Sequence, residues 1–415
     1  MRRRQVIKTL RGGVLALMAQ GCAGALGRSN KNQNHPKQQV SHATPASAPA
    51  GSLNIRDFGA VGDGRNNDAG SINAAIRQLS SNENGGTLWF PKGKYWIDPS
   101  GLDAGPNQLF SQFSNITFKG SSANDSEWLI SPQYTREDQR LFYHDKQSQC
   151  KNWRFEDLRI NCQGEQTKES KECFRDKLIK VFVEKFTVRR CIFLNEPGRG
   201  LFTVLGNHQH YEDCDFYGVG CRATDSSIIH PGNINNSVRD ITITNCRAIS
   251  GNPEAGRFNR TTFYDAQASD VLIKDCEISG GKKGLILALG KTRNSNISVV
   301  DCKITVHHHC IHIYPSRNTE MHAELSNIMI NHCTFESAVP LQLTGSDQAS
   351  VKDITIQRSR IQTTRGIRRE WLKGAFVSEL VIKETTVCRK LGNCETIKLL
   401  KLSAPYGAIM GSALP

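Results

Sequence analysis

Long apolar runs are missing from this 415-residue sequence: no stretch of 18 consecutive apolar residues occurs, which excludes a membrane-spanning helix. Acidic residues are missing from residues 1–51, which carry eight Lys and Arg and so contribute +8 of the formal net charge of +14. The rest of the chain therefore carries only +6. Hydrophobic residues make up 38% and charged residues 22%, a composition that argues against wholesale disorder and suits one elongated domain or two compact ones.

The basic N-terminal segment has the features of an export signal rather than of a nucleic-acid-binding arm. Its residues 3–8, Arg-Arg-Gln-Val-Ile-Lys, resemble the twin-arginine export pattern. A short, weakly apolar stretch follows and ends in Ala19-Gln20-Gly21-Cys22, which resembles a bacterial lipoprotein box. We therefore expect residues 1–22 to be an export signal with Cys22 as the lipidation site. We expect no nucleic-acid partner, and membrane contact only through the lipid on Cys22.

Residues 23–51 are rich in Asn, Gln, Ser, Ala and Pro without periodicity, which predicts a flexible tether. Residues 52–415 then form the folded domain. The expected location is the bacterial periplasm or outer membrane, as a lipoprotein, or the medium after secretion.

The cysteines lack any Cys-x-x-Cys pair, so their spacing does not predict a metal site. Without Cys22 there are 13, an odd number that excludes complete disulfide pairing. Seven of them end a recurring phrase of alternating apolar and polar residues, such as Ile241-Thr-Ile-Thr-Asn-Cys246. These seven are Cys162, Cys191, Cys214, Cys246, Cys276, Cys302 and Cys333, and two further copies end in Ser359 and Thr386. Whether Cys388 pairs with Cys394 stays open.

The phrases recur every 23 to 32 residues, which is the signature of a solenoid. Alternation within each phrase predicts a strand with one buried face, and no long helical stretch separates the copies. The pattern therefore predicts a parallel β-helix. In five of the seven copies the Cys is followed two residues later by Ile or Phe, as in Cys276-Glu-Ile278. A spacing of two puts the thiol on the same buried face as that apolar side chain, so the thiols should form a buried, unpaired column.

A cap precedes the repeats. Residues 54–64 read Asn-Ile-Arg-Asp-Phe-Gly-Ala-Val-Gly-Asp-Gly, a helical spacing follows over Ala69 to Leu79, and strands are predicted at 85–91 and 93–97. This region resembles the N-terminal cap of the pectate lyase superfamily, which includes polysaccharide lyases and polygalacturonases. The resemblance implies an all-β, right-handed parallel β-helix with an N-terminal capping helix and a polysaccharide partner.

In such β-helices a second strand of each coil lines the substrate groove. The matching segments here are 199–201, 225–230, 260–264, 283–285, 309–312 and 340–342. By resemblance to polygalacturonases, outward carboxylates on these strands would perform hydrolysis, yet only Asp225, with Asp265 nearby, is acidic in such a place. Glycoside hydrolysis normally needs two carboxylates.

The groove strands instead carry His, Tyr, Lys and Arg. That set suits β-elimination or C5 epimerisation of an acidic, uronate-containing polysaccharide, because a cation neutralises the carboxylate while a neutral base takes the C5 proton. The candidate catalytic residues are His312, His309, Tyr264 and Lys283, with Tyr264 expected on an outward strand face. The candidate substrate-binding residues are Arg257, Arg260, Tyr314, His230, Arg199 and Asp225.

Two alternatives remain at this stage: a glycoside hydrolase using Asp225 with Asp265, and a polysaccharide-binding envelope protein without chemistry. The run His307 to His309 also fits a solvated loop, and it lacks the ligand spacing of a zinc site. Pectate lyases use calcium held by carboxylates, but the candidate strands show no acidic cluster. We therefore expect neither a metal nor another cofactor.

Overall fold

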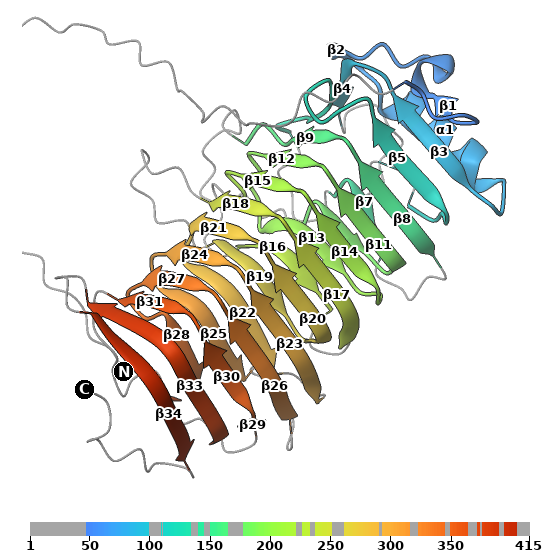
Figure 1. Ribbon diagram of the computed structural model, residues 1–415. Helices are drawn as coiled ribbons and strands as arrows, with labels where there is room; N and C mark the ends of the chain where they lie inside the picture. The colour runs from blue at the N-terminus through green and yellow to red at the C-terminus, as the bar shows by residue number, and fades with distance from the viewer. Residues whose placement is uncertain are drawn as a thin grey trace, which may run out of the picture. The chain divides into compact units, whose positions relative to one another are not determined.

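The computed structural model describes a β-helix with an N-terminal cap (Figure 1). The residues described are 47–98, 109, 111–133, 140–144, 150–164, 177–220, 226–232, 237–250, 261–289, 293–315, 323–344, 349–363, 372–373, 376–389 and 394–404. The expected signal at 1–22, with Cys22, lies outside this part of the chain, as does nearly all of the expected tether at 23–51. None of the described helices is long and apolar enough to cross a bilayer.

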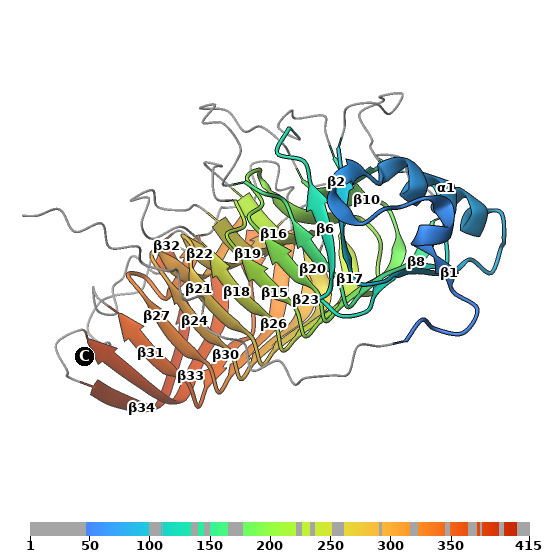
Figure 2. The same ribbon diagram turned by 90° about the horizontal axis from the view of Figure 1, so that it is seen from above.

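The cap forms as its sequence pattern predicts. A 3₁₀ turn, η1 (Ile55–Phe58), leads to the helix α1 (Ala69–Ser80), one residue longer than expected. Ile72, Ala75, Ile76 and Leu79 of α1 are buried, as their helical spacing requires. The helix covers the first turn of the β-helix, at the end opposite to the C-terminal strands (Figure 2).

Three rows of parallel strands stack coil upon coil and form the β-helix. Row I consists of β1 (Leu53–Asn54), β3 (Gly86–Phe90), β5 (Ile116–Gly120), β8 (Lys151–Glu156), β11 (Glu184–Arg189), β14 (Gln209–Glu212), β17 (Val238–Thr244), β20 (Ala268–Lys274), β23 (Asn294–Val300), β26 (Ala323–Asn331), β29 (Ala349–Val351), β30 (Ile354–Gln357) and part of β33 (Phe376–Arg389). Row II consists of β2 (Asp63–Asn67), β4 (Gly93–Ile97), β6 (Ser126–Ile130), β9 (Arg159–Asn161), β12 (Ile192–Leu194), β15 (Asp215–Tyr217), β18 (Arg247–Ser250), β21 (Glu277–Gly280), β24 (Lys303–Val306), β27 (Thr334–Ser337) and β31 (Arg360–Thr363). Row III consists of β7 (Phe142–Tyr143), β10 (Ile179–Val181), β13 (Gly200–Val204), β16 (Ser226–Pro231), β19 (Thr261–Ala266), β22 (Lys283–Leu289), β25 (His309–Pro315), β28 (Leu341–Thr344) and β32 (Leu372–Lys373).

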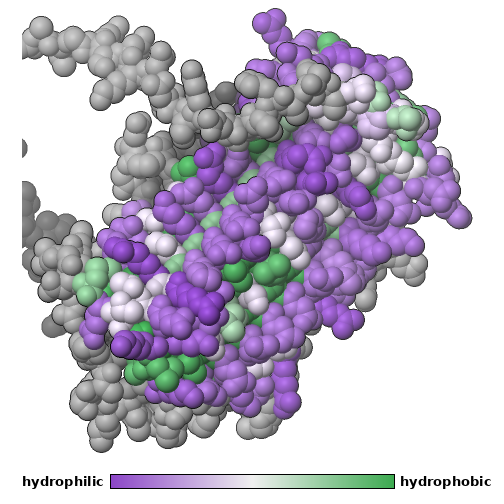
Figure 3. Space-filling view, in the orientation of Figure 1, coloured by the Kyte–Doolittle hydropathy of each residue, from purple (hydrophilic) through white to green (hydrophobic). Residues whose placement is uncertain are grey.

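The architecture is the right-handed parallel β-helix that the repeats predict. At the C-terminal end β34 (Cys394–Ala404) pairs antiparallel with β33, and a disulfide joins Cys388 to Cys394. The view of Figure 3, in the orientation of Figure 1, is dominated by hydrophilic side chains, as expected where alternate strand residues face outward.

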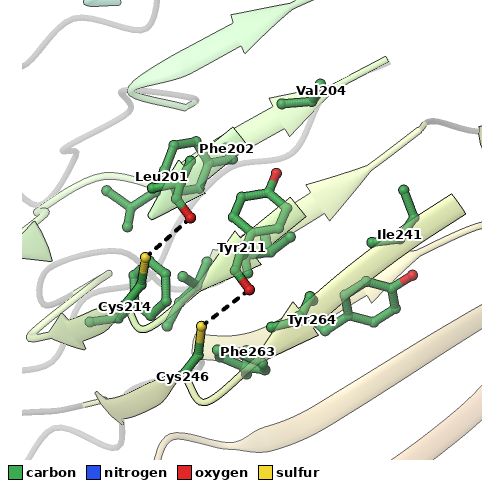
Figure 4. Close-up of a cluster of buried hydrophobic side chains, with 14 of the residues drawn as sticks. Leu201, Phe202, Val204, Tyr211, Cys214, Ile241, Cys246, Phe263 and Tyr264 are labelled. Atoms are coloured by element: carbon green, nitrogen blue, oxygen red, sulfur yellow. Dashed lines mark hydrogen bonds between the residues drawn. The ribbon is translucent and has the colours of Figure 1, made fainter. Parts of the chain in front are cut away.

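Six of the seven recurring cysteines, from Cys191 to Cys333, form the predicted buried, unpaired column. The prediction of Cys162 for the first position is wrong: the strand register places Leu158 before Cys191, and Cys162 is buried and unpaired outside the column. The chain corner just before each of these six thiols is made by a residue with positive φ, for example Asn245 (49°) and Asp275 (52°), a conformation that Asn and Asp tolerate. The thiol of Cys246 donates to the carbonyl of Tyr211 in the preceding coil at 3.7 Å (Figure 4).

Ser359 and Thr385 continue this column, because both are buried and each hydroxyl donates to the carbonyl two residues earlier. The prediction of Thr386 for the last position is therefore wrong by one residue. The positive φ of Glu384 (49°) marks the corner directly before Thr385.

Candidate functional site

The expected groove strands are the strands of row III, and their register aligns side chains from successive coils. Strand pairing places Ser227 beside Thr262, Thr262 beside Lys283, and Lys283 beside His309. We call these four residues the Lys283 column. Neighbouring coils lie about 4.8 Å apart, so Lys283 and His309 are direct neighbours, as predicted.

A second set of outward residues runs parallel to the first and contains His312. These residues, which we call the His312 column, are Thr203, His230, Asp265, Ile286, His312 and Gln342. Both columns meet on β25 because two consecutive residues there, Cys310 and Ile311, are fully buried. His309 and His312 are thereby brought to the same side, with ring centroids 4.8 Å apart.

His308, at the turn into β25, completes a histidine cluster. Its Nδ1 lies 2.5 Å from Nε2 of His309, and the two rings meet edge to face. His309 is only 6% exposed, and its Nδ1 has no hydrogen-bond partner among the described residues. One proton is therefore shared between the two rings, and which ring donates depends on their tautomers.

The imidazoles of buried His309 and half-buried His312 are both held in the neutral form. Burial, with the charges of His308, His312 and Lys283, lowers the pKa of His309 to about 3. Burial, with the charges of Lys283, His308 and Lys282, lowers the pKa of His312 to about 3. At neutral pH this part of the surface therefore offers uncharged imidazoles next to a lysine.

The prediction that Tyr264 faces outward is wrong. Tyr264 is 1% exposed and lies in the core near Tyr211 (Figure 4). Its hydroxyl has no hydrogen-bond partner among the described residues, and burial raises its pKa. The register gives the reason, since Tyr264 pairs with Ile229 on one side and Leu285 on the other, in a fully buried column.

His230, a candidate substrate-binding residue, belongs to the His312 column but lies three strands away from His312. Its Nδ1 lies 3.9 Å from a carboxylate oxygen of Asp265. Arg199 is exposed at the residue directly before β13. Among the described residues of the two columns, Asp265 is the one carboxylate.

Several predicted site residues cannot be placed. Asp225, Arg257 and Arg260 lie outside the described residues. Tyr314 is part of β25, in register with Ala288, but its side chain is outside the described part of the structure.

Sequence reasoning missed a buried polar contact at the far end of the Lys283 column. The ammonium group of Lys177 donates to the Ser227 hydroxyl at 2.6 Å and to the carbonyl oxygen of Arg199 at 2.8 Å. Gly200 makes this crossing possible, because a Cβ there would lie 3.1 Å from the Lys177 nitrogen and 1.7 Å from the Ser227 carbonyl oxygen. The one signal in the sequence was Gly200 itself, a residue without a side chain at the start of β13, where the register neighbour on the next coil is Ser227.

No group of three or more His, Cys, Asp or Glu suited to a metal ion occurs in the described ranges. The histidine cluster of β25 is thus not arranged as a metal centre in this part of the chain.

A profile of one protein family matches residues 52–285, which is 234 of the 415 residues. That family is described as rhamnogalacturonase A/epimerase, pectate lyase-like. The chain belongs to this family. The matched region of this family member runs from the cap through α1 to the first residues of β22, and it includes Lys283 but not His309 or His312.

The chain also resembles individual proteins, over a short segment of sequence in one case and in the fold in others. Mannuronan C5-epimerase AlgE3 of Azotobacter vinelandii is 44% identical over 52 residues, which is 12% of this chain and only 3% of that protein. Among solved structures, a double mutant of the tailspike protein of E. coli bacteriophage HK620 has a TM-score of 0.63 at 11% identity, over 82% of this chain and 62% of its own. The Azotobacter vinelandii mannuronan C-5 epimerase AlgE4 A-module gives a TM-score of 0.48 at 16% identity, over 74% of this chain and 86% of that module. At such identities the tailspike likeness concerns the fold alone.

Proposed function

We propose that this protein is a carbohydrate-active enzyme that removes the C5 proton of a uronate residue in an acidic polysaccharide, as a C5 epimerase or a lyase. The observation that carries the proposal is the placement of Lys283 next to two neutral imidazoles, buried His309 and half-buried His312, on the outer face of row III. Membership of a family whose description names an epimerase beside rhamnogalacturonase A supports it, as does the short match to a mannuronan C5-epimerase.

The chemistry needs three roles. The ammonium group of Lys283 pairs with the uronate carboxylate and stabilises the negative charge that develops there when the C5 proton leaves. The neutral ring of His312 accepts that proton. In epimerisation a proton returns to C5 from the opposite face, and in elimination the C4–O4 bond breaks and leaves a C4–C5 double bond.

The third role, in elimination, is that of the proton donor to the leaving O4 oxygen. Tyr264 cannot fill it from the core, so we assign it to the pair of His308 and His309, whose shared proton lies beside His312. A neutral imidazole can donate its N–H to the leaving oxygen, and the proton that His312 takes from C5 then replaces the one given up.

Hydrolysis is the weaker candidate because Asp265 is the single carboxylate among the described residues of both columns, and hydrolysis normally needs a pair. Its neighbour His230 does not supply the second one.

The purified full-length protein should be incubated in D₂O with polymannuronate, polygalacturonate and a neutral glucan. Three signals are followed: deuterium at C5 by NMR, near-ultraviolet absorbance of unsaturated uronate, and new reducing ends. Deuterium without chain cleavage on one acidic polymer identifies an epimerase, and absorbance with reducing ends identifies a lyase. Reducing ends without absorbance would refute C5 proton abstraction and point to a hydrolase, while silence in all three channels on every acidic polymer would favour a binding protein.

We also propose that the chain is exported and anchored through Cys22, on the strength of the N-terminal pattern alone. Fractionation of cells that express the wild type and Cys22→Ala tests this. The wild type should be in the membrane fraction and the variant in the periplasm or medium, and an unchanged distribution would refute the anchor.

A further inference from the structure

A cluster of cationic and imidazole side chains lies at the start of β22 and β25. Lys283 is the first residue of β22, and Lys282 directly precedes it. His309 and His312 belong to β25, and His308 lies in the turn directly before that strand. The charged neighbours that act on the rings of His309 and His312 are the members of this cluster themselves.

The strands packed on either side add little compensating charge. On β19, in register with β22, the residues facing this surface are Thr262 and Asp265. Asp265 is separated from His312 by the side chain of Ile286, about two coils away along the column. On the other side, β28 places the uncharged Gln342 beside His312.

This arrangement couples proton binding to anion binding. Lys283 is in register with His309, and its positive charge opposes a second positive charge on either ring. A carboxylate seated against Lys283 cancels that repulsion and adds its own attraction for an imidazolium. By reciprocity, a proton on one of the rings strengthens the binding of the carboxylate.

We propose that this cluster is a proton-coupled carboxylate site, in which the bound carboxylate itself increases the proton affinity of His312 and so prepares it as a base. The identity of the ligand as a uronate rests on the proposed function. The coupling does not, because it requires only a carboxylate beside Lys283. The free enzyme thus holds a weak base, and the substrate makes it a stronger one at the moment when the C5 proton is in reach.

The test is a pH titration of the imidazole resonances by NMR, on protein with isotope-labelled histidine. The variants His309→Gln and His312→Gln assign the resonances of these two rings. The probes are an oligomannuronate and sodium acetate, with a neutral mannan oligomer and sodium chloride as their respective controls. We expect either carboxylate to raise the pKa of His312 by about one unit or more, the size of effect that a nearby opposite charge has, and the controls to leave it unchanged.

Lys283→Met is the diagnostic variant and Lys303→Met its matched control, since Lys303 lies in row II, where it pairs with Glu277. In Lys283→Met the pKa of His312 should already be raised in the free protein, and the carboxylates should shift it much less. Lys303→Met should behave as the wild type.

If neither carboxylate moves the resonance of His312, or if Lys283→Met shows the wild-type shift, the inference is wrong. Turnover is a separate readout: C5 exchange without a ligand-induced shift would refute the coupling alone. A ligand-induced shift without exchange would refute the proposed function and leave the site standing.

Discussion

The buried ring of His309 makes the stability of this protein depend on pH. The pKa of His309 is about 3 in the folded chain, against 6.5 for an ordinary histidine. Because the folded-state pKa is the lower one, the unfolded chain binds more protons between these values, and stability falls as the pH falls through this range. At pH 5, which is 1.5 units below 6.5, the loss from this one ring is about 2 kcal/mol relative to neutral pH.

The variant His309→Gln removes this term, since glutamine does not titrate. Urea unfolding at pH 7.5 and at pH 5 gives the loss of stability on acidification for each protein. We expect that loss to be smaller in His309→Gln than in the wild type by about 2 kcal/mol, whatever the variant's absolute stability. His210→Gln is the matched control for the substitution itself, because His210 lies on row I with its side chain 41% exposed. An equal loss in His309→Gln and wild type would refute the burial and charge argument for this site.

Three further predictions concern the core and the turns that support row III. Tyr264→Phe should keep activity and raise the free energy of unfolding by about 1 kcal/mol in urea titrations, because it removes a buried hydroxyl without a described partner; loss of turnover with intact folding would contradict the buried placement. Gly200→Ala should cost roughly 2 kcal/mol or more in the same assay, since φ is +129° and the new Cβ would meet the Ser227 carbonyl oxygen, and unchanged stability would refute this close approach. Cys276→Ala should lower stability by about 1 kcal/mol through a small cavity, and the thiols of the native column should not react with an aromatic disulfide reagent until the chain unfolds; rapid labelling of the native protein would show that the column is open.

The repeat phrases predicted the fold because the strand pattern and the length of one coil are local features that every coil shares. Alternation sets the buried face of each strand, and the regular spacing of Cys246, Cys276 and Cys302 sets the length of a coil. The same reasoning located the row III strands and the neighbours Lys283 and His309. These features need no knowledge of the turns between the strands.

The direction of Tyr264 could not be read from alternation, because the row III strands bend. Phe263 and Tyr264 are both buried, as are Cys310 and Ile311 at the matching place on β25. Aligning Tyr264 with Leu285 would have predicted its burial.

The contact between Lys177 and Ser227 joins residues 50 positions apart across Gly200, which a repeat pattern does not reveal. It is possible because Gly200 has no Cβ to block the approach, and the repeats do not have a residue of this kind in common.

The most direct test of the site is the rate of solvent deuterium incorporation at C5 of an acidic polysaccharide, compared for wild type, His312→Gln and His210→Gln. If His312 is the base, its loss should reduce exchange by about a hundredfold or more, the usual contribution of a general base, while substrate binding measured in parallel persists. His210→Gln should exchange at the wild-type rate. Wild-type exchange in His312→Gln would contradict the account and move the chemistry away from the histidine cluster of β25.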